Sequence, residues 1–150
     1  MSREKINVAI VGLGFGKEFI PIYQNHPQTN MYAICQRTRE KLDEVGDQYR
    51  VSKRFESFEE LIQDLNVDAV HINSPIHLHA PQSIVALKAG KHVACTVPAA
   101  TTVEDCRDIV NAANAARKNY MMMETAVYTR EFLYVKQLYD EGALGTLTCC

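Results

Sequence analysis

The sequence predicts an α/β fold, a doubly wound parallel sheet (Rossmann-like) with helices on both faces. Strand-like apolar runs alternate with helical segments along the whole chain, and the first strand ends in glycines. The strands are apolar throughout, without an alternating pattern, which indicates burial on both faces. Helices that connect such strands form right-handed crossovers and cover the sheet on both sides.

The expected elements follow this alternation in order. Two helices begin with capping-box spacing, Ser57 with Glu60 and Thr101 with Glu104, in which the hydroxyl accepts a hydrogen bond from the backbone three residues on. The expected strands are 6–14, 31–36, 53–57, 68–74, 92–96 and 120–125, and the helices run to about 25, then over 38–50, 58–65, 79–89, from 101 to about 118, and over 131–141.

The composition indicates one globular domain. The chain has 150 residues, 47% of them hydrophobic and 23% charged, and a net charge of -2 without a Lys/Arg block. These values favour neither nucleic acid nor an anionic membrane as a partner. The apolar runs are too short to span a membrane, and the N-terminus lacks the apolar region of a secretory signal. A cytoplasmic location is therefore predicted.

Five cysteines show no metal-binding or redox spacing. Cys35 and Cys95 lie in strand-like runs, Cys106 in a helical one, and Cys149 and Cys150 are adjacent. Small buried thiols in a reducing compartment are the simplest interpretation.

A glycine-rich turn follows the first strand and is the main candidate for cofactor binding. A dinucleotide fingerprint has three glycines, for the tight turn, for the approach of the pyrophosphate, and for close helix packing. The first two positions fit, the third holds a lysine, and a glycine comes one place early. A purely structural turn is the alternative. The candidate residues are Gly12, Leu13, Gly14, Phe15 and Gly16.

The end of the second strand bears on the choice between NAD and NADP. An acidic residue about 20 residues after the glycines binds the ribose hydroxyls of NAD, but this chain has Gln36, followed by Arg37. A neutral amide does not repel a 2′-phosphate, and an arginine can bind one. The cofactor is predicted to be NAD(P), with a slight preference for NADP. Solvated surface charges are the alternative.

The ends of the fourth, fifth and sixth strands should meet at one crevice, because ligands of doubly wound sheets bind at the carboxyl ends of the strands. No metal site is predicted, since His71, His77 and His79 have no acidic or cysteine partner at ligand spacing. The further cofactor-binding candidates are Asn73, Ser74, Pro75, His77, His79, Thr96, Pro98 and Glu124.

Four segments resemble the Gfo/Idh/MocA family of nicotinamide-dependent oxidoreductases: the GLGFG turn, the SPIHLH turn at 74–79, the strand end AGKHVACTVP at 89–98, and REFLYVKQLYDEGALG at 130–145. Ser74, Pro75 and His79 match the Thr/Ser-Pro-x-x-x-His motif of that family. The resemblance implies a dinucleotide-binding domain followed by a second α/β domain that carries most of the substrate site. Family substrates are commonly sugars, inositols and related polyols or their keto forms.

The sequence departs from the family pattern at the catalytic position. The family usually has Glu-Lys-Pro, and this chain has Thr96, Val97 and Pro98, so no catalytic residue is assigned. Valine cannot transfer a proton, and Val97 is expected to line the nicotinamide side of the crevice. The candidate proton donors inside the chain are His77, His79 and Glu124, and a donor in the second domain is favoured.

Three functions remain open at this point. The first is the cofactor-binding domain of an NAD(P)-dependent oxidoreductase acting by hydride transfer on a sugar-, glycoside- or inositol-like alcohol or ketone. The second is a non-catalytic dinucleotide-binding domain, and the third is a methyltransferase, against which the SPxxxH turn argues. Residues 1–145 are expected to form the Rossmann domain, and 146–150 to begin a strand leading to the second domain. The full-length protein is expected to form a homo-oligomer and to bind its carbohydrate-like substrate through that domain.

Overall fold

A computed structural model describes residues 5–146 and 148. A six-stranded, all-parallel sheet has the strand order β3-β2-β1-β4-β5-β6. This order reverses direction between β1 and β4, which places a ligand crevice at their carboxyl ends. The predicted doubly wound fold is confirmed. The strands are β1 (Ile6–Val11), β2 (Thr29–Cys35), β3 (Lys53–Phe55), β4 (Ala69–Ile72), β5 (His92–Thr96) and β6 (Tyr120–Met123).

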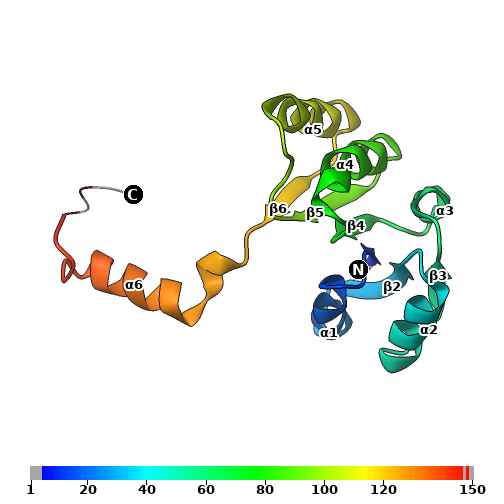
Figure 1. Cartoon of the computed structure of the whole chain (residues 1–150), viewed down its shortest axis with the longest axis horizontal. Helices are drawn as coiled ribbons and strands as arrows, with labels where there is room; N and C mark the ends of the chain where they lie inside the picture. The colour runs from blue at the N-terminus through cyan, green and yellow to red at the C-terminus, as the bar shows by residue number, and fades with distance from the viewer. Residues whose placement is uncertain (1–4, 147, 149–150) are drawn as a thin grey trace.

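Helices cover the two faces of the sheet unequally (Figure 1). On one face, α1 and α2 pack on β1 and β2, while α3, α4 and α5 pack on the other face. The α-helices are α1 (Ile20–Asn25), α2 (Arg39–Gln48), α3 (Phe58–Gln63), α4 (His79–Lys88), α5 (Val103–Ala116) and α6 (Arg130–Asp140), and the 3-10 helices are η1 (Gly16–Phe19), η2 (Ile76–Leu78) and η3 (Ala126–Tyr128).

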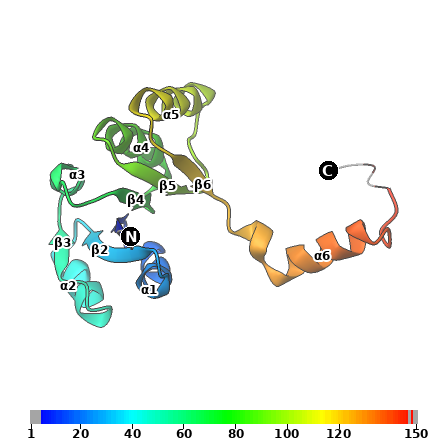
Figure 2. The ribbon, with the colours of Figure 1, turned by 180° about the vertical axis from the view of Figure 1, so that it is seen from behind.

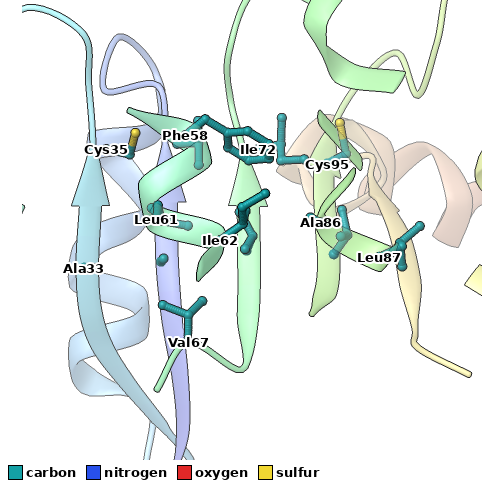
Figure 3. Close-up of a cluster of buried hydrophobic side chains, with 14 of the residues drawn as sticks. Ala33, Cys35, Phe58, Leu61, Ile62, Val67, Ile72, Ala86, Leu87 and Cys95 are labelled. Atoms are coloured by element: carbon teal, nitrogen blue, oxygen red, sulfur yellow. The ribbon is translucent and has the colours of Figure 1, made fainter. Parts of the chain in front are cut away.

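The larger core lies under α3, α4 and α5. Figure 3 shows Phe58, Leu61 and Ile62 of α3 lying over the central strands, with Ile72 beneath them. These side chains are almost fully buried, and burying one aliphatic side chain contributes about 1.5–3 kcal/mol. This packing holds the strand ends that carry the site.

One predicted helix start is wrong by one residue. Ser57 caps α3 as expected, accepting from the Glu60 N–H. For α5, however, Thr102 is the cap and accepts from the Asp105 N–H. Neighbouring threonines carry the same hydroxyl, and only the path of the chain out of the loop selects which one faces the helix end.

The sixth strand and the last helix are more exposed than the sequence suggests. A buried strand is predicted at Met121–Met123, but Met121 is 57% exposed, because β6 is an edge strand. Tyr128 and Tyr134, which lie on or near the last helix, are also exposed. Helix α6 projects away from the sheet (Figures 1 and 2). Residues 146 and 148 are in no strand, and the rest of the strand predicted at 146–150 lies outside the described residues.

The prediction that the cysteines are buried is met in part. Cys35 and Cys95 are buried, and burial raises the pKa of the Cys35 thiol to about 12. Cys106 is exposed, contrary to expectation, and Cys149 and Cys150 lie outside the described residues. Within the described ranges, no helix has the length and apolar character needed to cross a bilayer.

Candidate cofactor site

Two neighbouring clefts open at the carboxyl ends of the strands. The glycine cleft, about 700 Å³, lies along the ends of β1, β2 and β4 and is lined by Val11, Gly12, Gly14, Cys35, Gln36, Arg37, Lys41, Glu56, Ser57, Phe58, Glu59, Asn73, Ser74, Pro75, Leu78 and Gln82. The Val97 cleft, about 220 Å³, lies beside it and is lined by Phe15, Asn73, Ser74, Ile76, His79, Thr96, Val97, Met123 and Thr125. Asn73 and Ser74 line both clefts.

Position 12 requires a glycine because of its backbone conformation and a close neighbouring segment. Its φ of +85° is a conformation that L side chains rarely adopt. A Cβ at this position would lie 2.5 Å from the carbonyl oxygen of Asn73. The turn therefore brings the end of β1 against the end of β4.

Gly14 and Gly16 have different environments. A Cβ on Gly14 would meet nothing within 4 Å, so this position borders open space in the glycine cleft. A Cβ on Gly16 would lie 2.9 Å from Ile10 Cγ2. Gly16 thus provides the close packing expected of a third fingerprint glycine, and its early position does not break the pattern.

Gln36 supports the glycine turn directly. Its Oε1 accepts a hydrogen bond from the Leu13 N–H at 3.1 Å, and the Gly12 N–H donates to the Cys35 carbonyl at 3.0 Å. The Leu13 side chain points into the core and is fully buried. Only the backbone of Leu13 is thus near the cleft, and the amide at 36 has a structural partner that the sequence did not reveal.

Basic and acidic side chains line the outer part of the glycine cleft. Arg37 and Lys41 both line it, and neither forms an ion pair with the acidic groups in the described part of the chain. Glu56, which also lines the cleft, is paired with Arg39 at 2.9 Å. Lys41 was not predicted, although its position four residues after Arg37 at the start of a helix is a usable signal.

The Val97 cleft has an apolar wall. Val97 is 40% exposed and lines this cleft together with Phe15 and Met123. The Thr96 hydroxyl donates to the Ile72 carbonyl at 3.1 Å, which joins β5 to β4. Val97 thus borders a cleft, and its place beside the nicotinamide stays a prediction.

His79 is among the residues that line the Val97 cleft and is 2% exposed. Its Nδ1 is 2.7 Å from the Pro98 carbonyl oxygen, and its Nε2 is 2.8 Å from that of Ser74. Both ring nitrogens are therefore occupied by backbone groups of the two flanking loops. Pro98 contacts the site through its backbone carbonyl, which lies against the His79 ring.

His77 and Glu124, like Leu13, Gly16 and Pro98, line neither cleft. His77 is exposed on η2 and lines neither of them. Glu124 accepts from the Ala126 N–H at 2.8 Å and lines a separate apolar groove beside β6 and α1. Direct cofactor contact by His77 or Glu124 stays a prediction.

His71 is buried in the core and lines neither cleft. It is fully buried in β4, its Nδ1 lies 3.0 Å from the Tyr23 hydroxyl, and the Phe19 ring packs on it at 4.6 Å between centroids. Desolvation lowers the pKa of His71 to about 4 and raises that of Tyr23 to about 12. Among the described residues, no group of three or more His, Cys, Asp or Glu could hold a metal ion.

An oxidoreductase family with an NAD-binding Rossmann fold, Gfo/Idh/MocA, matches residues 6–124. The chain belongs to this family. It carries the NAD-binding fold of a family of oxidoreductases, as the glycine turn and the SPxxxH turn suggested.

Relatives and solved structures agree with this membership. The α-N-acetylgalactosaminidase of Shewanella oneidensis is 31% identical over 96% of this chain and 34% of that protein. A scyllo-inositol dehydrogenase of Lactobacillus casei, with bound NAD(H) and scyllo-inositol, superposes with a TM-score of 0.85 at 28% identity, over 97% of this chain and 44% of that one. An NAD-binding protein from Listeria innocua gives 0.87 at 30% identity, over 95% and 42%.

The chain is much shorter than these proteins. It spans about a third of the length of the curated relatives and less than half of the solved chains. The activity and substrates of the whole protein are therefore matters for proposal.

Proposed function

We propose that this chain is the cofactor-binding part of an NAD(P)-dependent enzyme that transfers hydride to or from a sugar-, glycoside- or inositol-like substrate. The observation that carries the proposal is the open position at Gly14, which faces the glycine cleft at the reversal point of the sheet. Gly14 leaves room for a pyrophosphate, and the Val97 cleft is the neighbouring space for the nicotinamide. The nicotinamide supplies the hydride chemistry, and the protein orients it and excludes water.

In this proposal the residues of this chain orient the nicotinamide and exclude water from it, but they do not supply a proton. Phe15, Val97 and Met123 make the second cleft apolar, and His79 has both nitrogens engaged. General acid-base help is worth about 10²–10⁴-fold in rate. We therefore assign the proton donor to the second domain and expect the 150-residue chain to bind cofactor without turning over substrate.

Within this proposal, NADP(H) binds at least as tightly as NAD(H). Arg37 and Lys41 both line the glycine cleft, without acidic partners in the described part of the chain. Gln36 has no charge to repel a 2′-phosphate. Of the two acidic residues in the lining, Glu56 is paired with Arg39, and Glu59 accepts a hydrogen bond from the Ser57 hydroxyl.

A cofactor-dependent glycosidase is a second candidate. The relatives from Shewanella are named α-N-acetylgalactosaminidase and glycosyl hydrolase family 109 proteins. Most glycosidases use two facing carboxyl groups, and NAD-dependent ones are exceptions. Among the described residues, none that lines the Val97 cleft is Asp or Glu, which favours the cofactor-dependent kind.

A second domain completes the site in this proposal. Residues 1–145 form the cofactor domain, and 146–150 lead into the α/β domain that holds the carbohydrate-like substrate and forms a homo-oligomer. The greater length of the relatives supports the proposal of a second domain. The cytoplasmic location and the absence of nucleic-acid and membrane partners remain predictions.

Thermal unfolding with NAD, NADH, NADP and NADPH tests cofactor binding by the chain. A ligand at one hundred times its dissociation constant adds about 2.7 kcal/mol of stability. Gly14→Val should remove this shift while the unligated protein keeps its fold, because the valine fills the open space in the cleft. Equal binding by the variant and the parent would place the phosphates elsewhere.

A second assay tests the enzyme itself. The full-length protein is tested for cofactor reduction on sugars and inositols and for release of nitrophenol from nitrophenyl glycosides, beside Val97→Lys. Activity in the parent places the proton donor outside position 97. No activity in the parent, with a gain in the lysine variant, would mean that the domain has lost its chemistry.

A further inference from the structure

We infer that His79 is a positioning residue whose ring, lying between the backbone carbonyls of Ser74 and Pro98, holds the wall of the nicotinamide pocket. The inference rests on the proposed function, in which the Val97 cleft receives the nicotinamide. It assigns to His79 no contact with the reacting atoms. Its role is to fix the loop that carries Val97.

The first support is the position of the ring between two loops. Ser74 follows β4 and belongs to both clefts, whereas Pro98 follows β5 directly after Val97. The two carbonyl oxygens lie 2.8 Å and 2.7 Å from the ring nitrogens of His79. No strand pairing extends beyond Ile72 and Cys95 to join these segments, so the ring continues the connection where the ladder ends.

The second support is the chemistry of the two partners. A carbonyl oxygen only accepts hydrogen bonds, and a neutral imidazole has one N–H. One ring N–H therefore donates to one carbonyl, and the inference assigns it to Nδ1 and the Pro98 carbonyl, which make the shorter contact. The ring is 2% exposed, and a buried polar group costs free energy unless it is hydrogen-bonded. The bond from Nδ1 therefore fixes the orientation of the ring.

The contact of His79 with Pro98 should affect binding of the nicotinamide half of the cofactor and not of the adenosine half. The Nδ1 bond acts on the Pro98 carbonyl, one residue from Val97, and the glycine turn is held by other contacts, from Gln36 and Cys35. Loss of the Nδ1 bond should loosen the nicotinamide wall and leave the adenosine and phosphate subsites in place. A residue of purely structural importance would affect both halves alike.

The test compares each cofactor with its fragment that lacks nicotinamide. Affinities of the 150-residue chain are measured for NADPH and 2′-phospho-ADP-ribose, and for NADH and ADP-ribose. The variants are His79→Asn, whose amide can replace Nδ1, and His79→Gln, whose amide can replace Nε2. His26→Asn and His26→Gln are matched controls, because His26 is exposed at the end of α1.

For His79→Gln we expect about tenfold weaker binding of NADPH and NADH, the effect of one positioned hydrogen bond, with fragment affinities within about twofold. His79→Asn should restore most of the cofactor affinity. Equal losses for cofactors and fragments, or no loss in either variant, would overturn the inference while leaving the proposed function intact. Failure of the parent to bind any of the four ligands would instead reject the proposed function.

Nitrogen-15 NMR of the parent chain gives a readout independent of ligands. A proton on Nδ1 of His79, identified by the absence of its signal in both variants, is expected. A proton on Nε2 alone would overturn the assigned bond to Pro98. Because fragment binding and thermal unfolding are recorded for each variant, a variant that does not fold is recognised, and the spectrum of the parent then decides the inference.

Discussion

At the scale of single residues, similar side chains have different roles because of their surroundings. Gly12 and Gly90 share positive φ values, of +85° and +79°, but only Gly12 faces another backbone segment. His71 and His79 are both buried. His71 lies beside the Tyr23 phenol and the Phe19 ring, whereas His79 lies between two backbone carbonyls. Residue type alone thus does not assign a role.

The two glycines give a direct test of the close approach. Gly12→Ala should cost at least about 3 kcal/mol of unfolding free energy, because a left-handed conformation and a clash with Asn73 add together. Gly90→Ala meets nothing within 4 Å and should cost about 1–2 kcal/mol. Urea denaturation measures both. Equal costs would mean that the β1 turn relaxes freely.

The buried His71 predicts a pH dependence of stability. Its pKa is about 4 in the folded protein against an ordinary value of 6.5, so the unfolded state binds the proton first as the pH falls. The stability is complete above pH 6.5 and is lost progressively between pH 6.5 and 4, by up to about 3 kcal/mol. His71→Gln should flatten the dependence over this range, whereas the exposed His26→Gln should not. Parallel pH profiles for parent and His71→Gln would contradict the assignment.

At the scale of elements, the ends of helices and strands decide the site. Strand β4 ends at Ile72 and the next two residues line both clefts. Helix α5 begins one residue later than predicted, with Thr102 as its cap. Short shifts of this kind change which side chain faces a loop without changing the fold.

The cap of α5 can be tested with adjacent threonines. Thr102→Ala should destabilise the chain by about 1 kcal/mol, because the Asp105 N–H loses its acceptor at the helix end. Thr101→Ala should change the free energy of unfolding by less than about 0.5 kcal/mol. Chemical denaturation of the two variants decides between the caps, and the reverse order would restore the cap predicted from the sequence.

At the scale of the whole molecule, the chain has a packed sheet and a helix that extends from it (Figure 2). Helix α6 packs mainly against η3, and its apolar side chains are largely exposed. The groove formed by Phe19, Tyr23 and Met121–Met123 is also uncovered by other described residues. The sheet and its two clefts are therefore complete without α6.

Shortening the chain tests this independence. A chain ending at Tyr128 should unfold within about 0.5 kcal/mol of the parent and bind NADPH with the same affinity, because the clefts contain no residue of α6. Thermal unfolding and cofactor titration measure the two properties. A large loss in either would show that α6 supports the sheet.

The sequence by itself determined the parallel sheet, the order of its elements, the glycine turn and the absence of a lysine at Val97. These properties are local, because continuous apolar strands, a strand-turn-helix junction and a missing amine can be recognised from neighbouring residues. The Ser57 cap also followed from local pattern.

Only the tertiary structure decided which side chains meet. Gly16 packs on Ile10, Gln36 holds the Leu13 N–H, and His79 joins Ser74 to Pro98. It also decided that the methionines of β6 are exposed, since the strand lies at the edge of the sheet. Contacts of this kind depend on the register and order of strands that are far apart in sequence, and such pairing leaves no periodic signal in the sequence itself.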